Sequence, residues 1–323
     1  MPIDWQSNLE DFFAELERGG PYESMDDVSR AVERIARRHN NQPESALGGL
    51  TPYQLYRLLA DDWSSPRAVL HLNDSLTLDE LAGAPLLADA RTVLDYIAAE
   101  GPVAETPRRN LKRAAVAALW PRLILPGFFP GIDDPDGRLP RDEDEAYWLM
   151  PLRYALELAR LTMRRKGVRI TPRGRDLARA ENAGALYALL FRTVFRQLNL
   201  QVFDGERHAG LQQTLGYTLF QLGECARHWA SAAVLAETAW LDSGKDPLQP
   251  WEIQSDVDYR YRALANQVLR PLAAFGLLET RPLVEPEPRV FRDTLEYRVS
   301  PLFGRFFRFD LDAPDPLGIR IVR

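Results

Sequence analysis

The segment from Leu156 to Leu177, which reads LELARLTMRRKGVRITPRGRDL, constrains the fold more than any other part of the chain. Its first half is amphipathic and predicts a helix that ends near Gly167, because glycine readily adopts the left-handed conformation of helix ends. A short β-branched run follows. Thr171-Pro172 then predicts another helix, since a hydroxyl caps free backbone N–H groups and proline suits the first helical position.

Related endings occur before and after this segment. Gly101 precedes Thr106-Pro107, and Gly276 precedes Ser300-Pro301. In the last case two stretches of alternating hydrophobicity predict a pair of strands, at Leu277–Val284 and Leu295–Val299. The helical spacing of apolar residues predicts further helices at Asp4–Arg18, Met25–Ala36, Asp89–Glu100, Asn110–Leu119, Glu145–Lys166 and Tyr259–Phe275.

The second and third of these segments resemble the C-terminal part of bacterial winged-helix domains. Typical of that part are a helix, a glycine followed by leucine or valine, and a strand that ends in Thr-x-x-Gly. The matching residues here are Gly167-Val168, Thr171 and Gly174, and then Gly276-Leu277 with Ser300. The first segment departs from the pattern. The resemblance implies a fold and not an activity, since some winged helices bind DNA with a recognition helix and a wing, and others hold proteins together.

The length of 323 residues suits several small units, and 46% hydrophobic residues suffice for packed cores. We predict a mainly α fold with small β-wings, in which multiple winged-helix-like units stand on a helical scaffold. The predicted parts are a helical N-terminal region (1–88), a first winged-helix-like unit (89–125), a linker loop (126–144), a second unit (145–182), a buried helical core (183–250) and a C-terminal unit (251–323).

Composition narrows the class of protein. The single cysteine, Cys225, excludes an internal disulfide, and neither a secretion signal nor an apolar run of membrane-spanning length is evident, so we expect a cytoplasmic protein. The net charge of −6 argues against indiscriminate coating of nucleic acid. Only Lys112, Lys166 and Lys245 among the 40 basic residues are lysine, which is typical of a GC-rich bacterial genome. Arginine abundance alone is therefore no sign of DNA binding.

The distribution of charge is more informative. Nine basic residues between Arg153 and Arg179 stand against only Glu157 and Asp176. Two interpretations are open: the guanidinium groups contact phosphates, or they pair with the acidic stretch Asp133–Glu145. A smaller basic group follows Thr106. The predicted nucleic-acid-binding residues are Arg160, Arg164, Arg165, Lys166, Arg169, Arg173 and Arg175, with Arg108, Arg109, Lys112 and Arg113.

Catalytic and metal-binding motifs are weak. The chain has no Gly-x-Ser-x-Gly, no Gly-x-x-x-x-Gly-Lys-Ser/Thr and no Gly-x-Gly-x-x-Gly sequence, so we expect neither an enzyme nor a cofactor. Cys225 and His228 lack the further ligands that a zinc site needs, although His208 lies nearby in sequence. Asp134-x-Asp136 resembles a calcium loop but fails in register, because Ile132 takes the first ligand position. We predict no metal.

Two hypotheses for the function remain. In the first, the chain binds nucleic acid, DNA in particular, through phosphate contacts of the arginine-rich segment. In the second, it is a scaffold whose winged helices bind a protein partner or a second copy of the chain.

Overall fold

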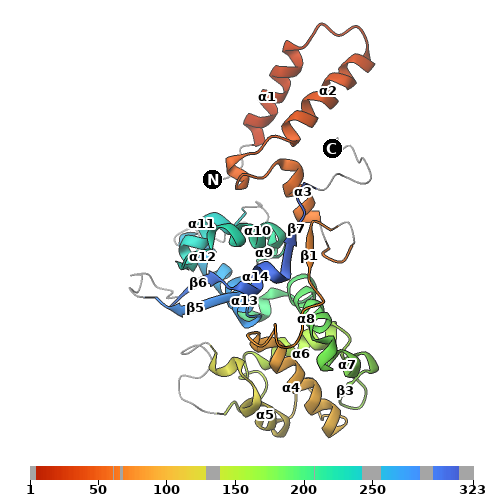
Figure 1. Ribbon diagram of the computed structural model, residues 1–323, viewed down its shortest axis with the longest axis vertical. Helices are drawn as coiled ribbons and strands as arrows, with labels where there is room; N and C mark the ends of the chain where they lie inside the picture. The colour runs from red at the N-terminus through yellow and green to blue at the C-terminus, as the bar shows by residue number, and fades with distance from the viewer. Residues whose placement is uncertain are drawn as a thin grey trace.

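The computed structural model describes residues 5–60, 62–65, 68–128, 139–206, 208–241, 256–283 and 294–312. The chain is mainly helical and holds small antiparallel sheets, which confirms the predicted fold class at that level. Figure 1 shows an elongated molecule in which a pair of N-terminal helices projects from a larger body. None of the helices in the described ranges is long and apolar enough to cross a membrane.

The projecting pair, which we call the arm, consists of α1 (Trp5–Arg18) and α2 (Met25–Asn40), close to the predicted bounds. The hydroxyl of Ser24 caps α2 by accepting a hydrogen bond from the backbone N–H of Asp27. α3 (Pro52–Ala60) leads from the arm into the body (Figure 1).

The first sheet of the body lies among helices that come from two of the predicted units. β2 (Thr162–Arg164) and β3 (Val168–Ile170) form an antiparallel hairpin. Val103 pairs with the other edge of β3, because its backbone N–H donates to the carbonyl of Val168 (2.9 Å) and the N–H of Val168 donates back (2.8 Å). The surrounding helices are α4 (Pro85–Glu100), α5 (Arg113–Leu119), α6 (Leu149–Leu158) and α7 (Pro172–Leu177).

The predicted helix that continues to Lys166 is wrong, because α6 ends at Leu158 and the chain turns into β2. Arg160 ends the helical segment with a φ of 59°, and the backbone N–H of Leu161 donates to the carbonyl of Leu156 (2.9 Å). The residues after Leu158 are mostly good helix formers. Their extended conformation comes from pairing with β3, which no local pattern records.

Gly167 is therefore not a helix end. It lies in the turn of the β2–β3 hairpin, where Lys166 and Gly167 both have positive φ values, 55° and 106°. Such values suit a tight hairpin turn, and glycine adopts them without steric cost. A Cβ at Gly167 would lie 2.7 Å from the carbonyl oxygen of Val103, so the close approach of the neighbouring strand also requires glycine.

The first Thr-Pro pair does not begin a helix either. Thr106 and Asn110 close a turn, with the N–H of Thr106 donating to the carbonyl of Asn110 (2.7 Å). Glu105 and Leu111 form an antiparallel bridge on either side of that turn, and α5 begins only at Arg113. The predicted helix Asn110–Leu119 thus starts three residues too early, because its first residues continue the strand pairing.

The second sheet repeats the same order of elements. β4 (Ala230–Ser231) pairs with β6 (Leu295–Val299), which pairs with β5 (Leu278–Pro282), so the predicted C-terminal hairpin is confirmed. The Pro- and Glu-rich segment Glu285–Asp293, for which the sequence predicts a loop between the two strands, lies outside the described residues. The helices of this half are α10 (Leu215–Cys225), α11 (Ala232–Ala239), α12 (Asp256–Leu264), the π-helical turn η8 (Ala265–Leu269) and α13 (Arg270–Ala274).

Matching hydrogen bonds join the two hairpins to the helices before them. The hydroxyl of Thr171 donates to the carbonyl of Arg160 (2.9 Å), and the hydroxyl of Ser300 donates to the carbonyl of Gly276 (2.6 Å). Gly276, with a φ of 74°, therefore corresponds to Arg160 and not to Gly167. The Thr171 hydroxyl also caps α7 by accepting from the N–H of Gly174 (2.9 Å).

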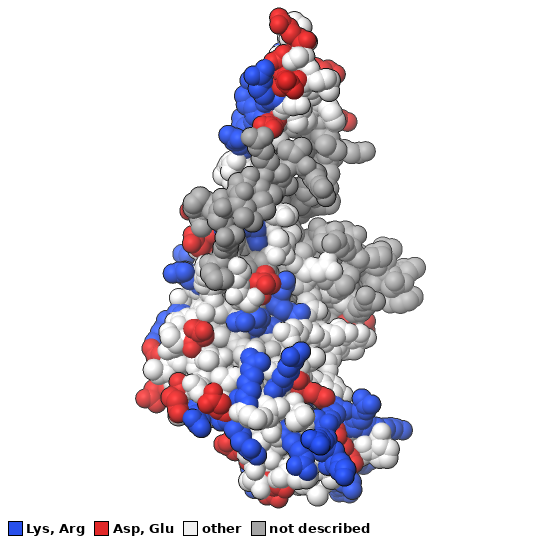
Figure 2. Space-filling model, turned by 90° about the vertical axis from the view of Figure 1, so that its right-hand side faces the viewer, with Lys and Arg blue, Asp and Glu red and all other residues white. Residues whose placement is uncertain are grey.

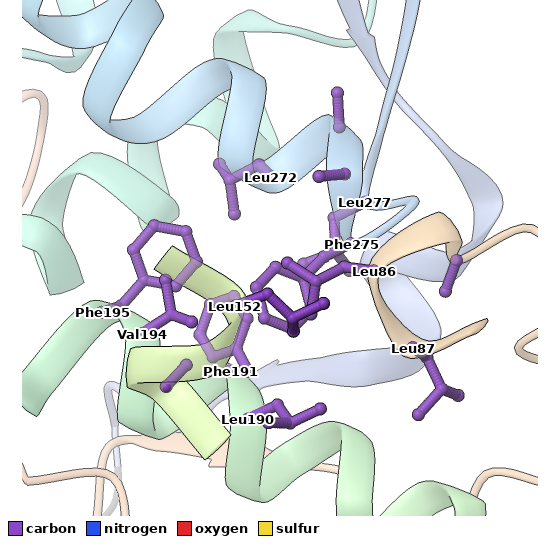
Figure 3. Close-up of a cluster of buried hydrophobic side chains, with 14 of the residues drawn as sticks. Leu86, Leu87, Leu152, Leu190, Phe191, Val194, Phe195, Leu272, Phe275 and Leu277 are labelled. Atoms are coloured by element: carbon purple, nitrogen blue, oxygen red, sulfur yellow. The ribbon is translucent and has the colours of Figure 1, made fainter. Parts of the chain in front are cut away.

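One hydrophobic core connects both halves of the body. Figure 3 shows leucine and phenylalanine side chains from α4, α6 and α13 converging on Phe191 and Phe195, which come from α8 (Ala183–Arg192) and the π-helical turn η5 (Thr193–Gln197). The hydroxyl of the fully buried Tyr187 donates to the carbonyl of Phe275 (2.6 Å). The two sheets therefore belong to one packed body.

The last described strand returns to the N-terminal region. β7 (Phe307–Phe309) follows α14 (Pro301–Phe306) and pairs antiparallel with β1 (Leu70–Leu72). This pairing fixes the end of the described chain against the segment that follows α3. The remaining short helices are η1 (Ser45–Leu47), η2 (Trp120–Arg122), η3 (Leu125–Gly127), η4 (Ala180–Asn182), η6 (Leu200–Phe203) and α9 (Ala209–Gln213).

Candidate nucleic-acid interface

The first sheet brings the two predicted basic groups together. The strand pair around Val103 and Val168 is antiparallel, so the chain beyond Val103 runs towards the turn of the β2–β3 hairpin. The Thr106–Asn110 turn follows directly, and the backbone N–H of Lys112 donates to the carbonyl of Ala104 (3.1 Å). Arg108 and Arg109 thus lie at the same edge of the body as the hairpin turn.

We call the cations at this edge the tip group. All six of these side chains are exposed, and within the described chain no carboxylate lies within ion-pairing distance of them. Because each cation is accessible and not neutralised, the group is available to an external anion. Its members are Arg108, Arg109, Lys112, Arg113, Arg165 and Lys166.

Further cations continue from the tip along the outer side of the hairpin. Val168 and Ile170 are buried, and Arg169 between them is exposed, as the alternation of a strand requires. The Nε of Arg169 donates to the carbonyl of Arg165 (3.1 Å), which holds the side chain along the hairpin. At the other end lie three exposed arginines, which we call the base group: Arg160, Arg173 and Arg175.

Together the tip group, Arg169 and the base group form the cationic ridge. Strands rise about 3.3 Å per residue, so the four or five residues from turn to base span roughly 15 Å. One strand of duplex DNA carries a phosphate about every 3.4 Å along the helix axis, so this length faces about four phosphates. Figure 2 shows lysine and arginine side chains gathered on the lower part of the molecule, at the height of β3 and α7 in Figure 1.

Arg164 differs from the other predicted contacts. Its Nη2 lies 2.8 Å from the carboxylate of Glu157, and its Nε lies 3.5 Å from that of Glu105. Arg164 is therefore paired internally, but with carboxylates outside the acidic stretch Asp133–Glu145 that was predicted to neutralise the basic segment. The pairing joins β2 to α6 and to the strand of Val103, so Arg164 stabilises the sheet on which the ridge stands.

Arg153 is not a surface cation at all. Its side chain is 1% exposed and forms an ion pair with Glu143, which is 0% exposed. The other oxygen of Glu143 accepts a hydrogen bond from the backbone N–H of Leu111 (2.6 Å), and Nη2 of Arg153 donates to the carbonyl of Arg109 (3.2 Å). This buried pair fixes the Thr106–Asn110 turn against α6.

The predicted pairing of the basic segment with the acidic stretch Asp133–Glu145 is thus limited, in the described residues, to Arg153 with Glu143. Asp133, Asp134 and Asp136, with the calcium-like sequence, lie outside those residues. Asp144 accepts a hydrogen bond from the side chain of Asn110 (2.8 Å), so it too holds the turn.

Sequence patterns gave no indication of a second buried carboxylate that supports this region. Asp89 on α4 is 1% exposed and accepts hydrogen bonds from the backbone N–H groups of Ile124 (2.7 Å) and Leu125 (2.9 Å). Burial raises the pKa of Asp89 to about 6, although the two hydrogen bonds favour the charged form. An aspartate in an apolar helix carries no sequence signal that distinguishes this role from surface exposure.

The candidate metal ligands do not converge. Cys225 is the last residue of α10 and is half-buried, and burial raises the pKa of its thiol to about 11, which opposes the thiolate that a metal requires. His228 is exposed, whereas His208 is buried. Over the described ranges no group of three or more histidine, cysteine or acidic side chains is placed to hold a metal ion.

Comparisons with protein-family models, with curated proteins and with solved structures gave no match. The geometry and charge of the cationic ridge are therefore what indicate a function.

Proposed function

We propose that this chain is a winged-helix protein that binds the phosphate backbone of nucleic acid, duplex DNA in particular, through the cationic ridge. The observation that carries the proposal is the pairing of Val103 with Val168, which unites two basic segments, Arg108–Arg113 and Arg160–Arg175, that lie more than 45 residues apart. Lysine and arginine that neutralise phosphates release counterions, and this release supplies most of the sequence-independent affinity for DNA.

The order of elements supports the winged-helix part of the proposal. α4, the strand at Val103, α5, α6 and the β2–β3 hairpin follow one another, and the sheet order is Val103, β3, β2. α10, β4, α11, the helix from α12 to α13 and the β5–β6 hairpin give the same order, with a sheet of β4, β6 and β5. In this interpretation each hairpin is a wing, and the cationic ridge lies on the wing of the first unit and on the segments beside it.

The helix before the first wing limits how DNA is read. In a winged helix this element is the recognition helix, which reaches base edges in the major groove. α6 carries no exposed cation, because its one arginine, Arg153, is buried with Glu143. Its exposed large side chain is Leu158, which is 44% accessible. We therefore expect contacts to phosphates and little preference for base sequence.

The second wing favours a different role for the C-terminal unit. Arg281 pairs with Glu296 (2.7 Å) and Arg298 pairs with Glu279, and both guanidinium groups lie 4.6 Å from the ring centre of Trp229. The arginines of the two described strands of this wing are therefore each neutralised by a glutamate of the paired strand. η8 and α13, at the position of the recognition helix, are buried throughout. For this half of the chain we therefore prefer the scaffold hypothesis, in which the unit binds a protein partner or a second copy of the chain.

Fluorescence anisotropy with a labelled duplex tests the proposal. Changing Arg108, Arg109, Arg165 and Lys166 to alanine should weaken binding at least tenfold, and by a similar factor on duplexes of unrelated sequence. The matched control is Arg227→Ala, because Arg227 is equally exposed but pairs with Glu224 (2.8 Å) on α10. If the folded fourfold variant binds as tightly as the wild type, the cationic ridge is not the DNA-binding surface. The scaffold hypothesis would then be preferred.

A further inference from the structure

The arm exposes apolar side chains that no described part of the chain covers. None of its residues belongs to either hydrophobic cluster of the body, and of the arm side chains that are described only Ala31 and Ile35 are buried. Phe13 is 56% exposed and Met25 is 77% exposed. Helices of this length derive most of their stability from packing, so a partner that covers the arm would stabilise it.

The two helices of the arm carry opposite charge. Residues 10–18 of α1 hold four acidic side chains and one arginine, a net charge of −3, whereas residues 30–40 of α2 hold four arginines and one glutamate, a net charge of +3. Within the arm Glu15 pairs with Arg38. Among the described residues, no ion pair reaches Glu10 or Glu17 on α1, or Arg37 on α2. Arg30 pairs with Asp27 of its own helix (2.6 Å) and is exposed, so a second carboxylate can still reach it.

The spacing of these charges matches between the helices. Glu10 and Glu17 lie seven residues apart, and so do Arg30 and Arg37, which corresponds to about 10.5 Å along either helix axis. Phe13 lies on the same face as Glu10 and Glu17, because residues three and four apart are neighbours on a helix. A face of two carboxylates around a phenyl ring therefore fits a face of arginines, whose stems are apolar and whose guanidinium groups pair with both carboxylates and rings.

We propose that the partner of the arm is a second copy of this chain, with α1 of each copy packed against α2 of the other. In this arrangement Glu10 and Glu17 of one copy face Arg37 and Arg30 of the other, and Phe13 packs between them. A two-fold axis supplies both contacts at once, because a surface that holds both an acidic and a basic face is complementary to itself. The inference does not depend on nucleic-acid binding.

Charge reversal of one helix at a time provides the test. The variant E10R/E17R makes both faces basic, and the variant R30E/R37E makes both faces acidic. Sedimentation equilibrium of the full chain should give a wild-type dimer, and each variant alone should dissociate at least tenfold more readily, since like charges face each other. An equimolar mixture of the two variants should form heterodimers of wild-type strength, because both contacts are then between opposite charges.

The mixture separates loss of the interface from loss of folding, since a misfolded arm could not regain association by mixing. Circular dichroism of each variant supplies a second check on folding. A wild-type chain that is monomeric at high micromolar concentration would overturn the inference. So would a dimer that both reversals leave unchanged, or two folded variants that fail to associate with each other.

Discussion

The guanidinium group of Arg153 forms an ion pair with the carboxylate of Glu143, and both side chains are inaccessible to solvent. The pair joins α6 to the turn that presents Arg108 and Arg109, through the backbone groups of Leu111 and Arg109. A buried ion pair adds little net stability over apolar residues, but removing one partner leaves the other charge uncompensated. The cationic ridge therefore depends on two residues that cannot themselves contact a ligand.

Arg153→Met should lower the free energy of unfolding by about 3–5 kcal/mol, because the carboxylate of Glu143 stays buried without its cation. The double variant E143Q/R153M should regain part of this loss, since a neutral amide can still accept from the N–H of Leu111. Urea denaturation of the wild type and of both variants measures these free energies of unfolding. Arg227→Met, which breaks an exposed pair with Glu224, serves as the control and should cost less than about 1 kcal/mol. A cost for Arg153→Met no larger than that of the control would contradict the buried-pair assignment.

Asp89 should make stability depend on pH. Its folded pKa of about 6 lies above its ordinary value of 3.8, so the folded chain holds a proton that the unfolded chain has released between these two values. The contribution of Asp89 to the free energy of unfolding is therefore largest below about pH 4. It decreases by about 3 kcal/mol as the pH rises to about 6 and stays constant at higher pH.

Asp89→Asn should remove that fall, which urea denaturation at a series of pH values measures as the difference from wild type. Asp95→Asn, on an exposed position of the same helix, should leave it in place. If D89N and the wild type lose the same stability between pH 4 and 6, the carboxylate does not titrate in the way its burial indicates.

Gly174 and Gly304 lie in the short helices that follow the β2–β3 and β5–β6 strand pairs, three residues after Thr171 and four after Ser300, and should respond differently to alanine. A Cβ at Gly174 would overlap the carbonyl oxygen of Leu161, whereas Gly304 has no atom within 4 Å of that position. Gly174→Ala should therefore destabilise the chain by about 1–3 kcal/mol. Gly304 lies in α14, and alanine forms helix more readily than glycine. Gly304→Ala should therefore be neutral or stabilise the chain by up to about 1 kcal/mol. Thermal unfolding of both variants tests the comparison, and equal losses would show that the two positions are not packed as described.

The sequence predicted the C-terminal helix, hairpin and Ser-Pro helix start because each signal there is local. Gly276 ends a helix, and Leu295–Val299 alternates as a half-buried strand does. The β2–β3 hairpin was predicted only in its second strand, and β2 was mistaken for helix, for the opposite reason. Met163 and Arg164 favour helix by intrinsic preference, and only their pairing with β3 holds them extended.

The candidate site shows the same division. Exposed cations were recognisable from charge alone, and ten of the eleven predicted residues are exposed and free of carboxylate partners within the described chain; Arg164 is the exception. The union of the two basic groups rests on Val103 and Val168, which are 65 positions apart and carry no mark of their contact. The burial of Arg153 was also unpredictable, since its partner Glu143 belongs to a stretch that reads as a solvated acidic loop.

The salt dependence of DNA binding shows whether the cationic ridge contacts phosphates. The logarithm of the association constant decreases linearly with the logarithm of the salt concentration, and the steepness of this line counts the phosphates contacted. If the hairpin turn and the Thr106–Asn110 turn contact one phosphate backbone together, the steepness should decrease by about 2 in R108A/R109A and by about 2 in R165A/K166A. It should decrease by about 4 in the combined variant. Each variant should also lose affinity equally on unrelated duplexes. If neither R108A/R109A nor R165A/K166A changes the salt dependence, and both variants unfold at the wild-type temperature, the cationic ridge does not bind the phosphate backbone.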